Sequence, residues 1–397
     1  MTDSVDTSRR HFLQLSALFT AAGAAPLLGA LNTAQAKEPE APVRVGYLPI
    51  TDATPLLVAH QQKLWEKQGL EVEKPRLFRS WAQLVEAFLS GQVNVVHMLA
   101  PMSVYARYGS QSPAKVVAWN HVDGSSIAIA AKQNINEIKD LGGTTIAIPF
   151  WYSIHNIVLQ YLLRKEGLEP IGRGEPSAQQ VKLVVMPPSD MLPALATNRI
   201  AGYIVAEPFV ALSELKGLGK VLRFTGDVWK EHACCVVMMH QKDLELRPDW
   251  TQKVVNGIVQ AQAWARENRA ATAQLLSRRE PARYTPHTVE ALTKVLAPEA
   301  KDWRNYREGG AIKHDEWSRH RIDFQPYPFP SYTEKMVELL QSTYVEGESD
   351  FLEKLTPAAV AKDLVDDSFV KKAIETQGGM TVFGQPNSYV REEVVDA

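Results

Sequence analysis

From Val43 to His240 the sequence alternates short apolar runs with helical runs, and no other feature constrains the fold as strongly. The apolar runs cover residues 43–50, 93–99, 144–150, 181–188 and 200–208. A helical pattern covers residues 54–69, with Pro55 at the first helical position and Gly69 at its end. Strands that alternate with helices predict an α/β fold with largely parallel sheets. Beyond Gln241 the pattern is mostly helical.

Two breaks in the alternation divide the chain, near residues 131–143 and near 226–232. They predict a discontinuous lobe 1 (residues 43–130 and 229–330), a lobe 2 (131–228) and a C-terminal helical extension (331–397). A chain that crosses twice between lobes suits a hinge beside a cleft.

Residues 1–36 have the pattern of an export signal. Arg9-Arg10 precedes a segment that contains no Asp, Glu, Lys or Arg from His11 to Ala36. A small-residue cleavage site closes this segment at Ala34-Gln35-Ala36. We expect a cleaved twin-arginine signal and a periplasmic protein; the alternative is a membrane anchor.

The charge balance and the cysteines exclude several classes of protein. With 43 Lys+Arg and 45 Asp+Glu, the net charge of −2 offers no basic field for nucleic acid. Cys234 and Cys235, the two cysteines, are neighbours, so we expect no disulfide framework, no metal ligands and no cofactor. We expect their side chains to point to opposite faces of a strand, since a bond between neighbours is strained.

Polar and aromatic residues follow the predicted strands, where α/β proteins bind ligands. The candidate ligand-binding residues at these junctions are Thr54, Trp81, His155, Glu207 and Lys230. Free N–H groups at helix N-termini favour an anion, and a lysine and a histidine add charge-assisted hydrogen bonds. The pattern predicts a small oxyanion as ligand.

Each candidate also has a purely structural interpretation. Trp81 can simply cover the first turn of its helix, which we expect Ser80 to cap. Thr54 is placed to cap the first helix. Glu207 can be a carboxylate at a helix start with no further role. Lys230 and Glu231 can be a solvent-exposed charged pair in a loop. Asp52 can cap, and His97 and His232 can be structural histidines.

Common enzyme motifs are missing from the sequence. It contains no G-x-S-x-G elbow, no H-E-x-x-H and no G-x-x-x-x-G-K-[ST] phosphate loop. The chain is therefore expected not to hydrolyse ATP, and binding is favoured over catalysis.

Eight motifs occur in order, and together they resemble the nitrate- and bicarbonate-binding proteins of bacterial ABC importers. They are VGYLPITDATPLLVA, SWA, HMLAPM, PFWYSIHN, VVMPPSDM, GYIVAEPF, DVWKEHACC and RIDFQPYPFP. The resemblance spans about Val43 to Pro330. It implies a two-lobed periplasmic-binding-protein fold of type II, with a hinge and an anion in the interlobe cleft.

The resemblance also assigns roles to single residues. It implies that Trp81, His155 and Lys230 contact the anion, and that Glu231 matches a carboxylate that helps to hold calcium in bicarbonate-binding relatives. Ser125 stands where nitrate binders carry a glutamine, so the contact there must be remade. Ala233 stands where proline is usual.

These features predict a monomeric solute-binding protein that captures nitrate first, then bicarbonate or nitrite. It would deliver the anion to a membrane permease driven by a separate ATPase subunit, without being an enzyme itself. Three alternatives stay open: a binder of an organosulfonate or another small organic solute, an enzyme related to thiamine-pyrimidine synthases, and a sensor.

Overall fold

The computed structural model describes residues 41–317 and 320–397. The chain divides into two compact units, Met1–Glu38 and Pro39–Ala397, and the described residues belong to the second. The predicted export signal, residues 1–36, lies outside the described residues. Within the described part, no helix is both long and apolar enough to cross a bilayer.

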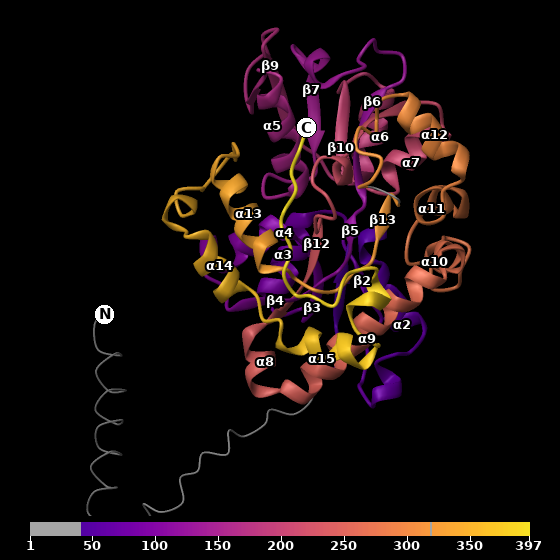
Figure 1. The fold of residues 1–397 in the computed structure, drawn as a ribbon, viewed down its shortest axis with the longest axis vertical. Coiled ribbons are helices and arrows are strands. Elements are labelled where there is room, and N and C mark those ends of the chain that lie inside the picture. Colours follow the sequence, from indigo (N-terminus) through magenta and orange to yellow (C-terminus); the bar gives the residue numbers. More distant parts are fainter. Residues whose placement is uncertain (1–40, 318–319) are drawn as a thin grey trace, which may run out of the picture. The chain divides into compact units, whose positions relative to one another are not determined.

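The unit is built on two sheets, which lie one above the other in Figure 1. The first sheet has the order β2-β1-β3-β12-β4 and comprises β1 Val45–Tyr47, β2 Arg76–Leu77, β3 Val95–Leu99, β4 Ala114–Trp119 and β12 Cys235–His240. The second has the order β11-β6-β10-β7-β9-β8 and comprises β6 Ser125–Ala130, β7 Thr145–Ile148, β8 Glu169–Ile171, β9 Gln180–Val185, β10 Gly202–Ala206 and β11 Gly219–Phe224. A small ribbon joins β5 Val122–Asp123 to β13 Ile322–Asp323.

Helices surround both sheets (Figure 1). α8 and α9 follow β12 in the chain and lie below the first sheet in that view. They are α2 Thr54–Gln61, α3 Trp81–Leu89, α4 Ala100–Val104, α5 Ile154–Lys165, α6 Pro188–Ala196, α7 Phe209–Leu215, α8 Gln241–Leu246, α9 Pro248–Glu267, α10 Arg269–Leu276, α11 Val289–Leu296, α12 Ala300–Glu308, α13 Pro330–Gln341, α14 Pro357–Leu364 and α15 Ser368–Thr376.

The chain leaves the first sheet after β4 and returns to it as β12. β12 inserts between β3 and β4 and runs antiparallel to both. β6 likewise runs antiparallel to its neighbours β10 and β11 in the second sheet. The expectation of largely parallel sheets therefore holds for β1–β3 and β7–β10. The antiparallel strands, β12 in the first sheet and β6 in the second, make each sheet mixed. β6 precedes the predicted boundary at residue 131 yet pairs in the second sheet; the domain limits stay a prediction.

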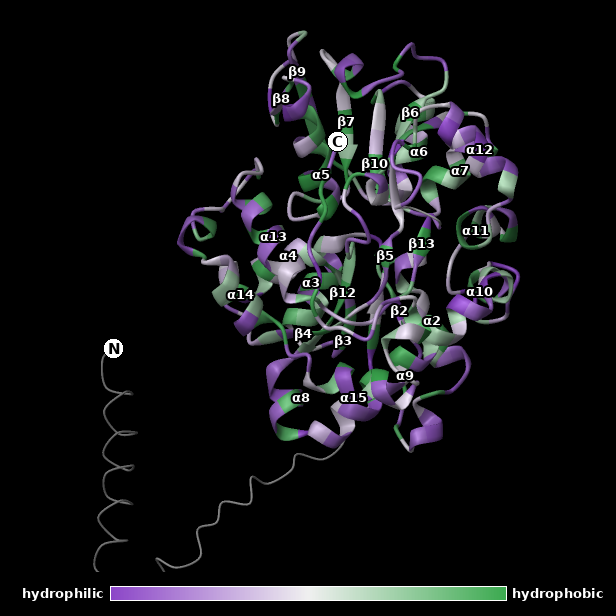
Figure 2. Cartoon of the chain, viewed as in Figure 1, coloured by the Kyte–Doolittle hydropathy of each residue, from purple (hydrophilic) through white to green (hydrophobic). Residues whose placement is uncertain are grey.

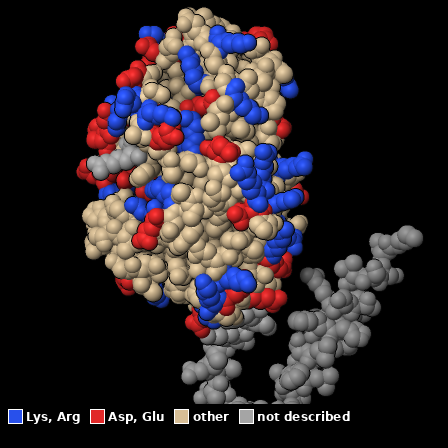
Figure 3. Space-filling view, turned by 90° about the vertical axis from the view of Figure 1, so that its right-hand side faces the viewer, with Lys and Arg blue, Asp and Glu red and all other residues tan. Residues whose placement is uncertain are grey.

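The apolar patterning places the strands in the core. In Figure 2 the strands β3 and β12 carry hydrophobic colours, while the exposed faces of α8 and α12 are hydrophilic. Each residue of β3 and β10 is buried, as expected for strands covered on both faces. On the face in Figure 3, basic and acidic side chains intermingle, in keeping with the balanced composition.

Two local predictions near the first helix are corrected by the structure. Thr54 does not cap α2: the capping position is Ala53, and the Thr54 hydroxyl donates to the Thr51 carbonyl at 2.6 Å. The helix ends at Gln61 because Lys63 adopts a left-handed φ of 56°, and Gly69 instead ends a later 3-10 turn. By contrast, Ser80 caps α3 as predicted, accepting from the Gln83 amide.

Gly257, in the middle of α9, is required by close packing. A Cβ there would lie 2.4 Å from the indole of Trp65, which is fully buried and donates to the Val254 carbonyl. We expect Gly257→Ala to lower the free energy of unfolding by about 1–3 kcal/mol, although alanine is intrinsically the better helix former by about 1 kcal/mol. Denaturant unfolding measures this. Gln260→Ala, on the exposed side of the same helix, is the control, and an unchanged or raised stability for Gly257→Ala would contradict the packing.

Candidate functional site

Six polar side chains meet between the two sheets and form what we call the buried polar cluster. The pairing of β12 with β3 and β4 brings Cys234 and Cys235 beside the segment that follows β4, since Cys235 lies opposite Leu99 and its carbonyl accepts from the Asn120 amide at 3.0 Å. The first residue of β6 and the first turn of α5 approach from the second sheet. The cluster consists of Asp52, His121, Ser125, His155, Cys234 and Cys235.

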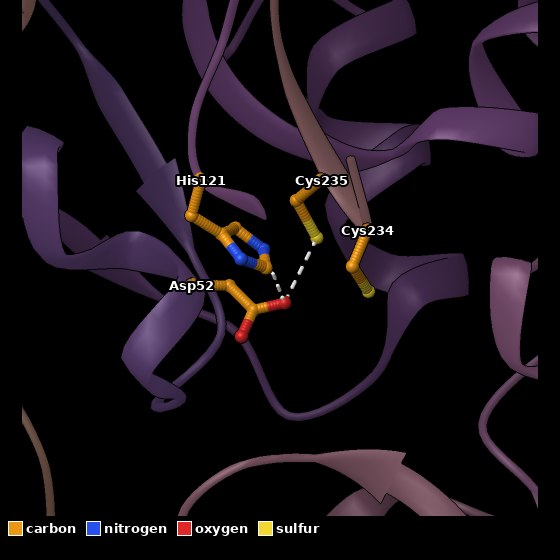
Figure 4. Close-up of side chains that lie close together, drawn as sticks. All are labelled: Asp52, His121, Cys234 and Cys235. Atoms are coloured by element: carbon orange, nitrogen blue, oxygen red, sulfur yellow. Dashed lines mark hydrogen bonds and ion pairs between the residues drawn. The ribbon is translucent and has the colours of Figure 1, made fainter. Parts of the chain in front are cut away.

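The side chains of the cluster are buried and lie in close contact. The Asp52 carboxylate lies 2.9 Å from Nε2 of His121, although off the line of a hydrogen bond, and accepts from the Cys235 thiol at 3.2 Å (Figure 4). Ser125 Oγ lies 2.9 Å from Nε2 of His155. Ser125 is 2% exposed, and the other five residues are fully buried.

The electrostatics of the cluster favour separated charges. Burial would lower the pKa of His121, but the Asp52 carboxylate outweighs it and raises that pKa to about 10. Burial raises the pKa of Asp52 and of Cys235. Burial also opposes ionisation of Cys234, yet hydrogen bonding from Cys235 and the nearby His155 and His121 imidazoles hold its pKa well below the ordinary thiol value. The His155 and His121 imidazoles therefore favour the thiolate form of Cys234.

Trp81 and His97 extend the cluster on the side of the first sheet. Their rings lie 5.4 Å apart, and the charges of His121 and Cys234 act on His97. Nε2 of His97 accepts from the Leu48 amide at 2.8 Å, and burial lowers the pKa of His97 to about 3. The ring is therefore neutral with its proton on Nδ1, because the other nitrogen acts as an acceptor.

Several polar atoms around the cluster have no hydrogen-bond partner within the described residues. They include the indole N–H of Trp81, Nδ1 of His97 and Nδ1 of His155. A buried donor without a partner costs free energy, so folded proteins rarely leave several together.

Glu207 and Thr54 are engaged in contacts inside the protein. The carboxylate of Glu207 forms an ion pair with Arg321 and accepts from Ser126 at 3.3 Å and from the Ala211 amide at 3.0 Å. Thr54 is buried and bonds locally. Their predicted part in ligand binding stays a prediction.

Lys230 and Glu231 lie in a different place from His155. They line a polar cavity of about 360 Å³ together with Asp123, Arg266 and Asp323. Trp81, Ser125 and His155 are not among the described residues that line it. The carboxylate of Asp123, one of the residues that line this cavity, lies 3.5 Å from Nδ1 of His232. The structure thus brings Ser125 and His155 into contact, places Trp81 beside His97, and places Lys230 in a separate cavity.

The role of the cysteines was not foreseen, and the expectation that they point to opposite faces is wrong. Cys234 precedes β12 and is not part of the strand's alternation, so both sulfurs approach Asp52 and His121 (Figure 4). The expectation of no metal ligands stays a prediction; it rested on sequence spacing, which cannot show that Asp52, His121 and the two cysteines lie together, because they come from three separate segments. The signal available in the sequence was that Asp52 and His121 each follow a strand of one sheet.

Comparisons with known proteins agree with this architecture. The family described as NMT1-like matches residues 36–277, more than half of the chain. The nitrate/nitrite binding protein NrtA of Nostoc sp. (strain PCC 7120) is 27% identical over 240 residues, which cover 56% of this chain and 53% of that protein. The chain thus spans about half the length of this curated relative.

Solved structures show the fold. The periplasmic nitrate-binding protein NrtA from Synechocystis PCC 6803 has a TM-score of 0.71 at 19% identity, covering 89% of this chain and 92% of that one. The alkanesulfonate-binding protein SsuA from Xanthomonas axonopodis pv. citri, bound to MOPS, has a TM-score of 0.56 at 15% identity, covering 85% and 99%. The predicted periplasmic-binding-protein fold and the resemblance drawn from the motifs are confirmed, and the chain belongs to the NMT1-like family.

Proposed function

We propose that this chain is the solute-binding component of an ABC importer and that it captures a small oxyanion, nitrate first. The observation that carries the proposal is a set of buried polar groups without a hydrogen-bond partner among the described residues: the N–H groups of Trp81 and His97 and Nδ1 of His155. A trigonal oxyanion has oxygens in several directions, so it can accept from donors on both sheets at once. Binding would then hold the two sheets together, as a hinged carrier requires.

Ser125 bears on the choice among oxyanions. It occupies the start of β6, where its hydroxyl already contacts Nε2 of His155 at 2.9 Å. A serine reaches less far than the glutamine of nitrate binders, so it supports His155 rather than replacing the missing amide donor. Nitrite and bicarbonate are the next candidates, since both present planar oxygens to the same donors.

The location and partners follow from the class of protein. Relatives named as nitrate-binding proteins of transport systems, and the Arg9-Arg10 motif, support a periplasmic carrier that is exported by the twin-arginine route. We infer that its partners are a permease and an ATPase subunit, and that the chain itself does not catalyse a reaction.

A second candidate ligand is an organosulfonate. A cavity of about 490 Å³ lies beyond the ends of β1 and β2 and next to α6 and α7. Apolar side chains dominate its lining, and three exposed arginines stand at it; the lining includes Leu48, Ile50, Leu77, Phe209, Arg79, Arg278 and Arg283. An anion with an apolar tail would suit this cavity better than nitrate does.

A thermal-shift screen distinguishes these ligands. A ligand that binds only the folded chain raises stability by RT ln(1 + [L]/Kd), so a carrier is identified by the solute that shifts its melting temperature. We expect nitrate, nitrite or bicarbonate to give the largest shift. A shift with an alkylsulfonate alone would favour the second candidate, and no shift with any of these anions would refute the proposal.

Lys230 provides a separate test of how far the anion site extends. No hydrogen bond or ion pair of its ammonium group is found within the described part of the chain, so it is available to an anion in the adjoining cavity. We expect Lys230→Ala to weaken anion binding at least about tenfold, the effect of losing one charge-assisted bond. Calorimetric titration measures this, with Lys220→Ala, whose ammonium donates to Asn136, as the control. Equal affinities of both variants would remove Lys230 from the site.

A further inference from the structure

We propose that Asp52, His121, Cys234 and Cys235 bind one zinc ion. The four residues come from three segments: the turn after β1, the residues after β4 and the start of β12. One ligand atom of each lies within 4.8 Å of the other three, and all four side chains are fully buried (Figure 4). This proposal does not depend on the anion-binding function.

The spacing of the four ligand atoms fits a single ion. A tetrahedral site with Zn–S bonds of about 2.3 Å and Zn–N or Zn–O bonds of about 2.0 Å sets its ligand atoms roughly 3.3–3.8 Å apart. The approaches of Asp52 to His121, at 2.9 Å, and to Cys235, at 3.2 Å, lie just below that range. The upper limit of 4.8 Å exceeds that range by about 1 Å, so metal binding would draw the most distant ligand atoms together by no more than about 1 Å.

The donor set selects the metal. Two sulfurs, one imidazole nitrogen and one carboxylate oxygen are the ligands of zinc, whereas calcium and magnesium take sets of oxygens. Four coordinate bonds form without transfer of electrons. Any proton that the two thiols, the His121 imidazolium or the Asp52 carboxyl group carries at a ligand position in the metal-free chain is released to solvent, so the ion meets two thiolates, a carboxylate and a neutral imidazole.

Unpaired atoms of the cluster are independent support for a missing ion. Oδ1 of Asp52 and Nδ1 of His121 have no hydrogen-bond partner within residues 41–317 and 320–397, although both groups are fully buried. Residues around the four ligands make hydrogen bonds to them. Ser125 Oγ donates to Cys234 Sγ at 3.7 Å, and the side-chain amide of Asn120 donates to the backbone carbonyl of Asp52. Such outer contacts orient the ligands of protein metal sites.

The test uses the full-length chain, reduced and freed of metal by a chelator, with Co²⁺ as the spectroscopic probe. One equivalent of Co²⁺ is expected to produce a thiolate-to-cobalt charge-transfer band and the visible bands of tetrahedral cobalt. One equivalent of Zn²⁺ is expected to abolish both. Absence of the charge-transfer band in the wild-type chain, with both thiols reduced, would overturn the proposal whatever the behaviour of the variants.

Variants then assign the ligands. Cys234→Ser and Cys235→Ser are each expected to lose the charge-transfer intensity of one thiolate and to bind at least a hundredfold more weakly. His60→Gln is the matched control, since His60 is half-buried and bonds to Tyr284 instead. A band of undiminished intensity in both cysteine variants would overturn the assignment. The titration is run without anion, so a chain that binds Co²⁺ but no nitrate refutes the proposed function and leaves the metal site intact.

Discussion

Replacing Arg321 by methionine is expected to lower the free energy of unfolding by about 3–5 kcal/mol, the cost of breaking a buried ion pair from one side. The Arg321 guanidinium is buried and pairs with Glu207 and with Glu214, the latter at 2.7 Å. It also donates to the Tyr306 hydroxyl at 2.8 Å. Burial opposes its charge, but the two carboxylates raise its pKa above the ordinary value. Without the arginine, the Glu207 carboxylate is left charged and unpaired in the interior.

Denaturant unfolding of the variants measures this effect. Arg279→Met is the matched control, because Arg279 pairs with Glu290 at 3.8 Å on the surface, where both side chains are mostly exposed. Such a pair contributes about 0–1 kcal/mol. If Arg321→Met stays within about 1 kcal/mol of the wild type, the ion pair is not what stabilises the contact between Glu207 and the segment before β13.

Trp81→Phe is expected to weaken binding of the oxyanion by about 10–100-fold. The change keeps an aromatic ring at the start of α3, makes it smaller and removes the buried N–H that has no partner among the described residues. A hydrogen bond to a charged group is worth about 1.5–3 kcal/mol, and about 1.4 kcal/mol corresponds to a factor of ten. His155→Ala, which removes the imidazole whose Nδ1 has no partner among the described residues, should cause a loss at least as large.

Trp250→Phe is a close control for this experiment. The indole N–H of Trp250 is also buried without a partner in the described part of the chain, but it lies in α9 beside Arg247. Its removal should leave the anion affinity unchanged. Equal losses for Trp81→Phe and Trp250→Phe in calorimetry would mean that the effect is general and that Trp81 does not contact the ligand.

Much of the fold could be predicted because its signals are local. The alternation of strands and helices, the cap at Ser80 and the junction residues Trp81 and His155 are all read from short windows of sequence. The strand β4 was missed, and with it the position of His121 directly after it. Two-sheet architecture could be expected, whereas the insertion of β12 between β3 and β4 depends on pairing between distant segments.

The candidate site was predictable only in part, for the same reason. Ser125 and His155 lie 30 positions apart and still meet, as the resemblance implied for residues around one ligand. The convergence of Asp52, His121 and the cysteines depends on register and on the bend before β12, and neither can be read from residue spacing. Glu207 illustrates the opposite case: its position after a strand suggested a ligand contact, but its partner Arg321 lies far along the chain.

The most direct test of the central claim is a calorimetric titration of the full-length chain with nitrate. The buried donors of Trp81, His97 and His155 predict saturation at one nitrate per chain, with a dissociation constant of about 1 μM, or roughly −8 kcal/mol. Nitrite and bicarbonate should compete for the same site. Absence of binding heat for nitrate, nitrite and bicarbonate at millimolar concentrations, from a chain shown to be folded, would contradict the account.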